Sequence, residues 1–515
     1  MRIMRARVLV LALTAAGCTA DIGTDTDSTG GASETQRLGD RSSDSSAIEH
    51  GRKIWFENTY GGQKFFAILA QLPPPRGIRI AFEELVTTPR SERFAQWGVI
   101  NDPDCHANPA GGLDICPDPT ATGVVGIRVF PGPGGSRLYG IACASCHAGF
   151  DPLKPPADPA EPKWANIHPT IGNQYAKFSR IFSDGLAADD VRRFMFTSWP
   201  DGAVDTTALF PDNIMNPGVV TAFWNHPYRP TFDVGTDEAK MRNGQGGEDD
   251  VGGDLAALRV YTNIGVCFQE CVAGPMQAGQ PIDIATCYAS CPDFPPQSDL
   301  DDLTAFLGSI KSPLYPARPK APLVYAAGRA VFDHTCAGCH DDHGARKKIL
   351  TNDEVNPLAD DALNATNACR ALSTNWQEGR LWAQFSSQVY KDRVAAGDRG
   401  YRTMPLTGIW ATAPFMHNQS IGARADASAG PDERVGAYWD AMWELLSVDR
   451  EPITYVLPVA VGPFPAGTPL HYLFSRDPAT GQILCTDLVE NHGHYYGSDL
   501  SVLEKLALIY WLQFQ

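Results

Sequence analysis

The pentapeptide Cys143-Ala-Ser-Cys-His147 decides the fold, and its pattern returns as Cys336-Ala-Gly-Cys-His340. Two cysteines at this spacing lie on one face of a helical turn, and a histidine follows them directly. This is the attachment signature of haem c, in which each thiol bonds a porphyrin vinyl group and the histidine binds the iron. With 13 Cys and 12 His in 515 residues, two copies are far more than chance would give. A pair of redox or zinc Cys-x-x-Cys motifs is the alternative interpretation.

The two motifs therefore predict two covalently bound haem c groups. Their protein ligands would be Cys143, Cys146 and His147 for the first, and Cys336, Cys339 and His340 for the second. Each histidine occupies only one face of its iron. The opposite face decides between electron carriage, which uses six strong ligands, and catalysis, which needs an open site for oxygen or peroxide.

The first 18 residues are typical of a lipoprotein signal peptide. Three arginines precede a short apolar run, 8–13, and Ala15-Ala-Gly-Cys18 resembles a lipobox in which Cys18 is lipidated. Ordinary export with cleavage nearby is the alternative. Residues 19–48 are rich in Ser, Thr, Gly and Asp and predict a flexible tether. We expect the folded part on the periplasmic side of a Gram-negative membrane, lipid-anchored to the outer membrane, or secreted.

Length and charge limit the class of protein. A chain of 515 residues with 43% hydrophobic and 20% charged residues is long enough for two or three globular domains. The formal net charge of −17 argues against a nucleic-acid partner, because phosphates require a basic surface. The same charge suits a basic redox partner protein.

Eight of the 13 cysteines remain after the haem cysteines and Cys18 are set aside, and an even number in an oxidising compartment predicts disulfides. A four-Cys metal site at 267–291 is the alternative for four of them. The expected pairs are Cys267 with Cys291, Cys271 with Cys287, Cys105 with Cys116, and Cys369 with Cys485. The first two pairs would join two antiparallel helices that turn around residues 274–281.

Each haem motif belongs to a unit with the same helical signals. Gly51-Arg-Lys-Ile-Trp55 and Gly328-Arg-Ala-Val-Phe332 place an aromatic residue four positions after a glycine. In cytochrome c folds such a glycine lets a C-terminal helix cross closely, and the aromatic ring packs at the crossing. Apolar stripes that begin at the expected caps Ser298 and Ser501 predict the crossing helices.

We therefore predict a mainly α fold of two cytochrome c-like haem domains with long loop insertions. The N-terminal domain would span 49–311 and the C-terminal domain 323–515, joined by a Pro-rich linker at 312–322. The insertion between Trp55 and Cys143 is expected to be rich in loops around 101–135.

Several residues could act beside the irons. Pro169 is the candidate whose carbonyl orients the His147 imidazole. His168 and His226 could reach the distal face of the first haem. For the second haem the candidates for a sixth ligand are Met404, Met416, His417, His492 and His494.

The stretch Leu406-Thr-Gly-Ile-Trp-Ala-Thr-Ala-Pro-Phe-Met-His-Asn418 resembles the dihaem cytochrome c peroxidase and MauG superfamily. Its fuller Gly-Ile-Trp-Ala-Thr-Ala-Pro-Phe form is most similar to the rubber-oxygenase-like branch. Residues 242–245, Arg-Asn-Gly-Gln, and 493–500, Gly-His-Tyr-Tyr-Gly-Ser-Asp-Leu, agree with the same branch.

This resemblance implies that His494 is the distal axial ligand opposite His340, with Met404 or Met416 as the alternative. His417 would lie near the haem without necessarily binding iron. The haem of His147 would keep an open distal face and form the active site, with Trp224, Gln245 and Glu248 as candidate distal residues. A calcium ion between the domains is also suggested by the resemblance.

Three functions follow from this resemblance. The first is a peroxidase that passes electrons from the C-terminal haem to the open N-terminal haem, where hydrogen peroxide is reduced. The second is an oxygenase that binds oxygen and cleaves an alkene, and the third is an electron-transfer cytochrome that is not an enzyme. The chain departs from the superfamily at 231–235, Thr-Phe-Asp-Val-Gly, where a Trp-Asp-Gly segment with an electron-relay tryptophan is usual; Trp224 or Phe232 could substitute.

Overall fold

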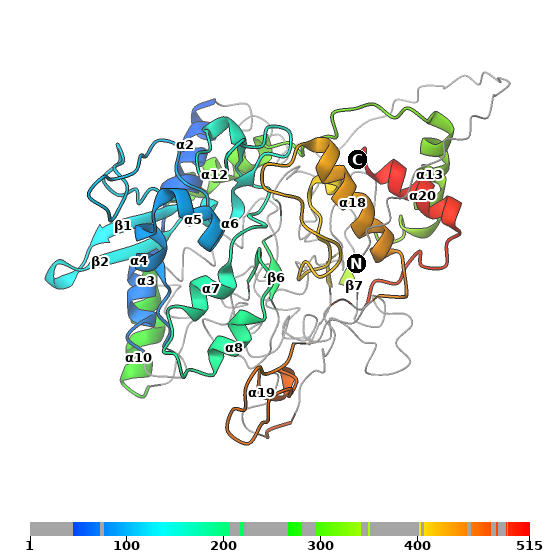
Figure 1. Ribbon diagram of the computed structural model, residues 1–515. Coiled ribbons are helices and arrows are strands. Elements are labelled where there is room, and N and C mark those ends of the chain that lie inside the picture. Colours follow the sequence, from blue (N-terminus) through cyan, green and yellow to red (C-terminus); the bar gives the residue numbers. More distant parts are fainter. Residues whose placement is uncertain are drawn as a thin grey trace.

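The computed structural model describes residues 45–72, 77–204, 217–220, 222, 266–280, 295–340, 349–350, 401–402, 406–450, 455–474, 480–482, 491 and 493–515. Within these ranges the fold is mainly helical with a few short strands, as predicted. The longest helices are α2 (Ser45–Glu57), α12 (Gln297–Ser309), α13 (Pro322–Thr335), α18 (Pro431–Leu445) and α20 (Val502–Leu512). They form two groups, with α2 and α12 on one side and α13, α18 and α20 on the other (Figure 1).

Shorter helices surround the first group (Figure 1). They are α3 (Gly62–Leu69), α4 (Phe82–Thr87), α5 (Arg90–Trp97), α6 (Ala144–His147), α7 (Phe178–Ser183) and α8 (Arg192–Thr197). The first helix, α2, begins at Ser45, four residues before the predicted start of the N-terminal domain. Cys18 and most of the predicted tether lie outside the described residues.

Helices α2 and α12 cross at Gly51, as the sequence predicts. A side-chain carbon on Gly51 would lie 2.0 Å from Asp302 O and 2.9 Å from Phe306 Cβ, so only glycine permits this approach. Trp55 lies one turn further along α2, is 1% exposed, and has its ring centre 6.4 Å from that of Phe306. The two ends of the predicted first domain therefore share one core.

The second crossing, between α13 and α20, repeats this arrangement. A carbon on Gly328 would lie 2.0 Å from Ala507 O and 2.6 Å from Trp511 Cβ. The rings of Phe332 and Trp511 pack with centres 4.6 Å apart. Ser501 caps α20 as predicted: its hydroxyl accepts a hydrogen bond from Glu504 N, and Glu504 Oε2 accepts one from Ser501 N at 2.8 Å.

The predicted cap of α12 is wrong by two positions. Helix α12 begins at Gln297, and the residue in the cap position is Pro296, with the extended backbone that precedes a helix. Ser298 therefore lies inside the first turn. The proline fixes the entry into the helix by its own backbone angle, which a search for a hydroxyl cap does not detect.

In the described part of the chain, four two-stranded antiparallel sheets lie between these helices. The pairs are β1 (Ile127–Pro131) with β2 (Arg137–Ile141), β3 (Gly149–Phe150) with β4 (Ile167–His168), β5 (Ala203–Val204) with β6 (Gly218–Val219), and β7 (Ile349–Leu350) with β8 (Tyr401–Arg402). The β1–β2 hairpin corrects the expectation of loop up to residue 135. Its Pro- and Gly-rich turn, with Gly134 and Gly135 at positive φ, made the whole stretch look irregular in sequence.

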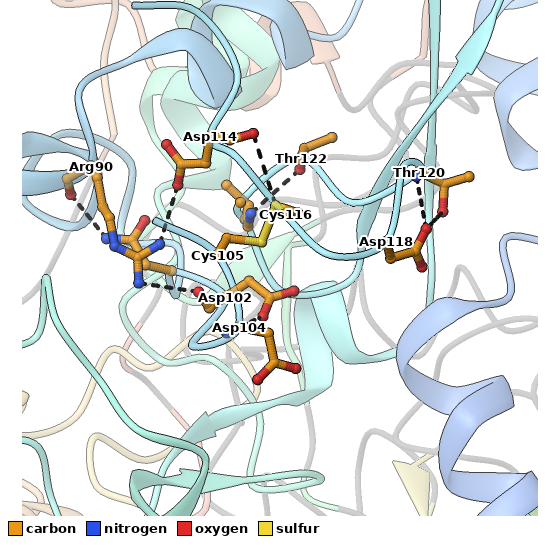
Figure 2. The surroundings of a disulfide bond; sticks show 12 residues. Arg90, Asp102, Asp104, Cys105, Asp114, Cys116, Asp118, Thr120 and Thr122 are labelled. Carbon is orange, nitrogen blue, oxygen red and sulfur yellow. Dashed lines mark hydrogen bonds and ion pairs between the residues drawn. A yellow bond between two sulfur atoms is a disulfide. The ribbon is translucent and has the colours of Figure 1, made fainter. Parts of the chain in front are cut away.

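The loop before this hairpin is held by a disulfide and by a buried charge cluster (Figure 2). Cys105 and Cys116 form a disulfide, as predicted. Asp114, with a side chain 4% exposed, accepts hydrogen bonds from Arg90 Nη1 at 3.2 Å and from Arg93 Nη1 at 3.0 Å. Both arginines are themselves buried. One carboxylate thus balances two guanidinium groups inside the fold.

Cys267 and Cys271 both form disulfides, which supports the disulfide interpretation over the metal site. Their expected partners, Cys287 and Cys291, lie outside the described residues, as do Cys369 and Cys485. The helix that carries them continues through the π-helical residues Gln269–Ala273 into α10 (Gly274–Gln277). The turn expected at Gly274 therefore comes several residues later, because Gly274 and Pro275 extend the helix.

The core of the first group receives residues from the far end of the chain. It contains Leu69, Phe196 and Phe268, together with Leu457 and Leu470, and all five are at most 2% exposed. Phe464 and Leu473, the latter in the short helix α19 (His471–Phe474), pack on it as well. A segment beyond the predicted linker thus returns to the first group, where α19 lies below α8 in Figure 1. Among the described helices, none is long and apolar enough to span a membrane.

Candidate haem sites

The first haem motif forms one tight helical turn at α6. Cys146 N and His147 N both donate to Cys143 O, at 3.3 and 3.1 Å. The thiols of Cys143 and Cys146 are free. Burial, and then the neighbouring Cys146, raise the pKa of Cys143 to about 12, and burial also raises the pKa of Cys146. Both thiols are thus buried on one helical turn, at the spacing used for attachment to a porphyrin.

The proximal side of this turn is built by the β3–β4 pair, which brings the chain after His168 back beside the motif. Gly172 N donates to His147 O at 2.7 Å, and Asn173 N donates to Cys146 O at 2.8 Å. The ring of Trp55 lies 5.4 Å from the ring of His147, and Trp55 Nε1 donates to Pro169 O at 2.9 Å. The tryptophan at the helix crossing therefore links Pro169 to the histidine of the first motif.

His168, considered as a distal ligand from the sequence, has a structural environment. Its Nδ1 accepts a hydrogen bond from Thr170 N at 3.3 Å, and its ring also bonds the backbone of Lys311. Burial lowers the pKa of His168, against opposing effects of Asp151 and the Lys311 backbone. It stands in strand β4 beside the proximal loop, where it joins this loop to the end of α12.

The second haem motif follows α13 directly. Cys339 N and His340 N donate to Cys336 O at 3.0 and 2.9 Å, the same turn as in the first motif. Both thiols are free. Burial, and then Cys339, raise the pKa of Cys336 to about 12. Cys336 packs against the core of Phe332, Trp410 and Trp511, so the second motif also sits beside its helix crossing.

His494 faces His340 across a gap of the right size for an iron. Their ring centres are 6.4 Å apart. An imidazole nitrogen binds a first-row metal at about 2.0 Å, and the ring centre lies roughly 1 Å beyond, so two imidazoles on one iron have centres about 6 Å apart. The two histidines, with the cysteines 336 and 339, therefore fit a haem c with two axial imidazoles.

The state of the His494 ring also fits this role. Burial, then His340 and then Arg450, lower its pKa to about 4, so the imidazole is neutral at physiological pH, as a metal ligand must be. Its Nδ1 is buried and has no hydrogen-bond partner among the residues that the structure describes. His494 also has a φ of 52°, in the left-handed region, directly after Gly493 at 91°. Strained backbone of this kind is concentrated at functional sites.

Two other sequence candidates, Met416 and His417, lie in a different segment. Met416 and His417 belong to the tight turn between Phe415 and Ile421, and His417 O accepts a hydrogen bond from Val219 N of β6 at 2.5 Å. This turn therefore contacts the first helix group. Trp224, His226, Phe232, Gln245, Glu248, Met404 and His492 lie outside the described residues.

The stretch at 406–418 connects the two units that carry the motifs. Trp410, in the short helix η6 (Ile409–Ala411), is fully buried and donates to Pro313 O at 2.7 Å. Gln174 Nε2, just after the first proximal loop, donates to Thr412 O at 2.8 Å. Tyr175 OH donates to Ala425 O at 3.0 Å and accepts from Arg434 Nη2 at 3.3 Å. The proximal loop of the first motif is thus bonded directly to the second unit.

Sequence reasoning missed Arg450 and Tyr175. Neither belongs to a recognisable motif, and their partners are distant in sequence. Calcium finds no support: across the described ranges, no group of three or more His, Cys, Asp or Glu side chains could hold a metal ion.

A family model described as RoxA-like, cytochrome c-like, matches residues 400–425. The match includes the whole of the stretch 406–418, and it suggests a c-type cytochrome. No curated protein matches the chain at a significant level.

Proposed function

We propose that the protein is an exported dihaem c-type cytochrome that acts as a redox enzyme of the peroxidase type. Electrons from a redox partner protein enter at the haem of His340 and His494 and pass to the haem of His147, where hydrogen peroxide is reduced to water. Each peroxide takes up two electrons and two protons. The haems supply the redox chemistry when bound. The protein supplies ligands, orientation and the connection between the sites.

The facing histidines His340 and His494 carry this proposal. A pair of neutral imidazoles on one iron leaves no position for a substrate, which makes the second site suited to electron transfer. Catalysis is therefore assigned to the first site. Trp55 and Pro169 support His147 there by fixing the proximal loop against α2.

The bonds from Gln174 and Tyr175 to the second unit support the coupling of the two sites. They begin within three residues of Gly172, whose amide bonds His147 O, and end at Thr412 and Ala425. A short bonded connection of this kind keeps the relative position of the two motifs constant. That constancy is what repeated electron transfer between two fixed centres requires.

An oxygenase that cleaves an alkene is the second candidate function. The match of residues 400–425 to a RoxA-like family model favours it. This activity would use the same open first haem but would bind oxygen and need no external reductant in each turnover.

Absorption and electron paramagnetic resonance spectra of the purified holoprotein test these functions. We expect one low-spin haem, which does not respond to added ligands, and one high-spin haem, which shifts with peroxide and, when reduced, with carbon monoxide. Stable oxygen binding at the high-spin haem, without peroxide turnover, would favour the oxygenase. Two low-spin haems that ignore both ligands would refute both enzymes and leave an electron-transfer cytochrome.

A further inference from the structure

The loop that carries His494 needs an external restraint. His494 and Gly493 both have left-handed backbone, which costs free energy for a residue with a side chain. The ring of His494 must nevertheless keep one position opposite His340. Its Nδ1 has no partner within the described part of the chain, so the side chain does not fix itself through that atom. A restraint on the backbone of this loop would hold the ring in that position.

Arg450 provides this restraint. It is 6% exposed and lies just after the C-terminal end of α18. Within the described part of the chain, its guanidinium group donates to six backbone carbonyl groups. These are Asn491 O at 2.9 Å, Gly493 O at 2.7 Å, Leu445 O at 2.6 Å, Ser447 O at 3.0 Å, Glu444 O at 3.2 Å and His494 O at 3.4 Å.

These acceptors belong to two segments that are far apart in the sequence. Residues 444–447 lie at and just after the end of α18, where a helix leaves carbonyl groups without helical partners. Asn491, Gly493 and His494 belong to the loop of the proposed distal histidine. The guanidinium carbon also lies 4.7 Å from the ring centre of Tyr495, which fixes the residue that follows His494. A planar group with several donors can join two segments in this way, and a lysine cannot.

We propose that Arg450 is the positioning residue for His494. It binds the loop of His494 to the end of α18 and so keeps the imidazole at the axial distance from His340. This inference rests on the proposed ligation of the second haem by His494. The guanidinium group of Arg450 bonds the backbone carbonyl of His494, so its positioning effect on the haem would pass through the backbone.

The test compares Arg450→Lys and Arg450→Met with His494→Ala in the full-length holoprotein. We expect both Arg450 variants to keep two covalently bound haems, because the bonds to Cys336 and Cys339 do not involve the loop. The low-spin fraction should fall in both, and one additional reduced haem per chain should bind carbon monoxide. Added imidazole should restore the low-spin spectrum, as it should in His494→Ala.

Arg434→Lys and Arg434→Met are the matched controls. Arg434 is 4% exposed, lies on α18 and donates to Ala429 O and Tyr175 OH, so these variants also remove a buried arginine from the same unit. They should leave the second haem low-spin. If Arg450→Met fails to fold, Arg450→Lys still provides the test. It keeps the positive charge and part of the hydrogen bonding but loses the planar guanidinium group that joins the two segments.

The outcomes distinguish ligation by His494 from the positioning role of Arg450. If His494→Ala leaves both haem spectra unchanged, the proposed ligation fails, whatever Arg450 does. If His494→Ala produces a high-spin haem while both Arg450 variants stay low-spin, the positioning role is wrong and the ligation stands. Arg450 variants that stay low-spin and change only the reduction potential would show that the charge acts, and not the position of the loop.

Discussion

Gly328 offers a sharp test of the helix crossing that supports the second haem motif. In Gly328→Ala the new carbon would lie 2.0 Å from Ala507 O and 2.6 Å from Trp511 Cβ. A carbon comes no nearer to a carbonyl oxygen than about 3.3 Å, so α13 and α20 would have to separate by roughly 1 Å. A gap of that size removes a quarter to a half of the dispersion energy across the contact. We expect Gly328→Ala to lower the free energy of unfolding by about 3 kcal/mol, at the upper end of ordinary overpacking effects.

The assay is guanidinium unfolding of the holoprotein, followed by circular dichroism in the far ultraviolet and by haem absorbance. Gly436→Ala on α18 is the matched control, since a carbon there meets no described atom within 4 Å. It should leave stability unchanged or raise it by about 0.5–1 kcal/mol, because alanine favours a helix over glycine. Gly51→Ala and Gly308→Ala form an equivalent pair in the first crossing.

Equal unfolding midpoints for Gly328→Ala and Gly436→Ala would refute the reasoning. They would mean that the helices separate without cost and that the crossing does not determine the position of Cys336. An intermediate result, with loss of the haem signal before loss of helicity, would instead locate the damage at the haem motif alone.

Three further predictions concern the first unit. Asp114→Asn should lower the free energy of unfolding by about 3–5 kcal/mol, because two buried arginines lose their shared carboxylate. The control is Glu161→Gln, since Glu161 is an exposed partner of Arg90, and it should cost less than about 1 kcal/mol. Both variants are measured by urea unfolding. Cys105→Ser should cost about 3 kcal/mol by the loop-entropy estimate for a sequence separation of 11; a midpoint equal to that of the parent would contradict it. Since burial lowers the pKa of His168 in the folded state, the unfolded chain binds its proton first, so stability should be constant well above pH 6.5 and fall as the pH drops below it. His168→Asn should remove that part of the pH dependence, and an unchanged pH profile would count against it.

The parts of the fold that the sequence predicts are those governed by local patterns. The Cys-x-x-Cys-His turns, the cap at Ser501 and the crossing glycines each need only a few neighbouring residues to be recognised. The crossing itself could be predicted because the contact at Gly51 or Gly328 excludes any other residue type.

The remaining features depend on contacts between distant segments. Arg450 stands in a sequence context with no motif, yet it meets carbonyl groups more than 40 residues away. Tyr175 shows nothing of its bond to Ala425, 250 positions further on. The β1–β2 hairpin was hidden by its prolines and glycines, which dominate the local signal although the flanking residues pair.

The return of residues 455–473 to the first core has a consequence for how the molecule can be divided. Leu457 and Leu470 are almost completely covered there, beside Phe268. If the chain were divided at the predicted linker, the N-terminal fragment would lose part of its apolar core. The C-terminal fragment would expose the apolar residues 455–473 to water. Neither fragment would keep the packing that it has in the intact protein. The two units, however similar their motifs, therefore depend on one uncut chain.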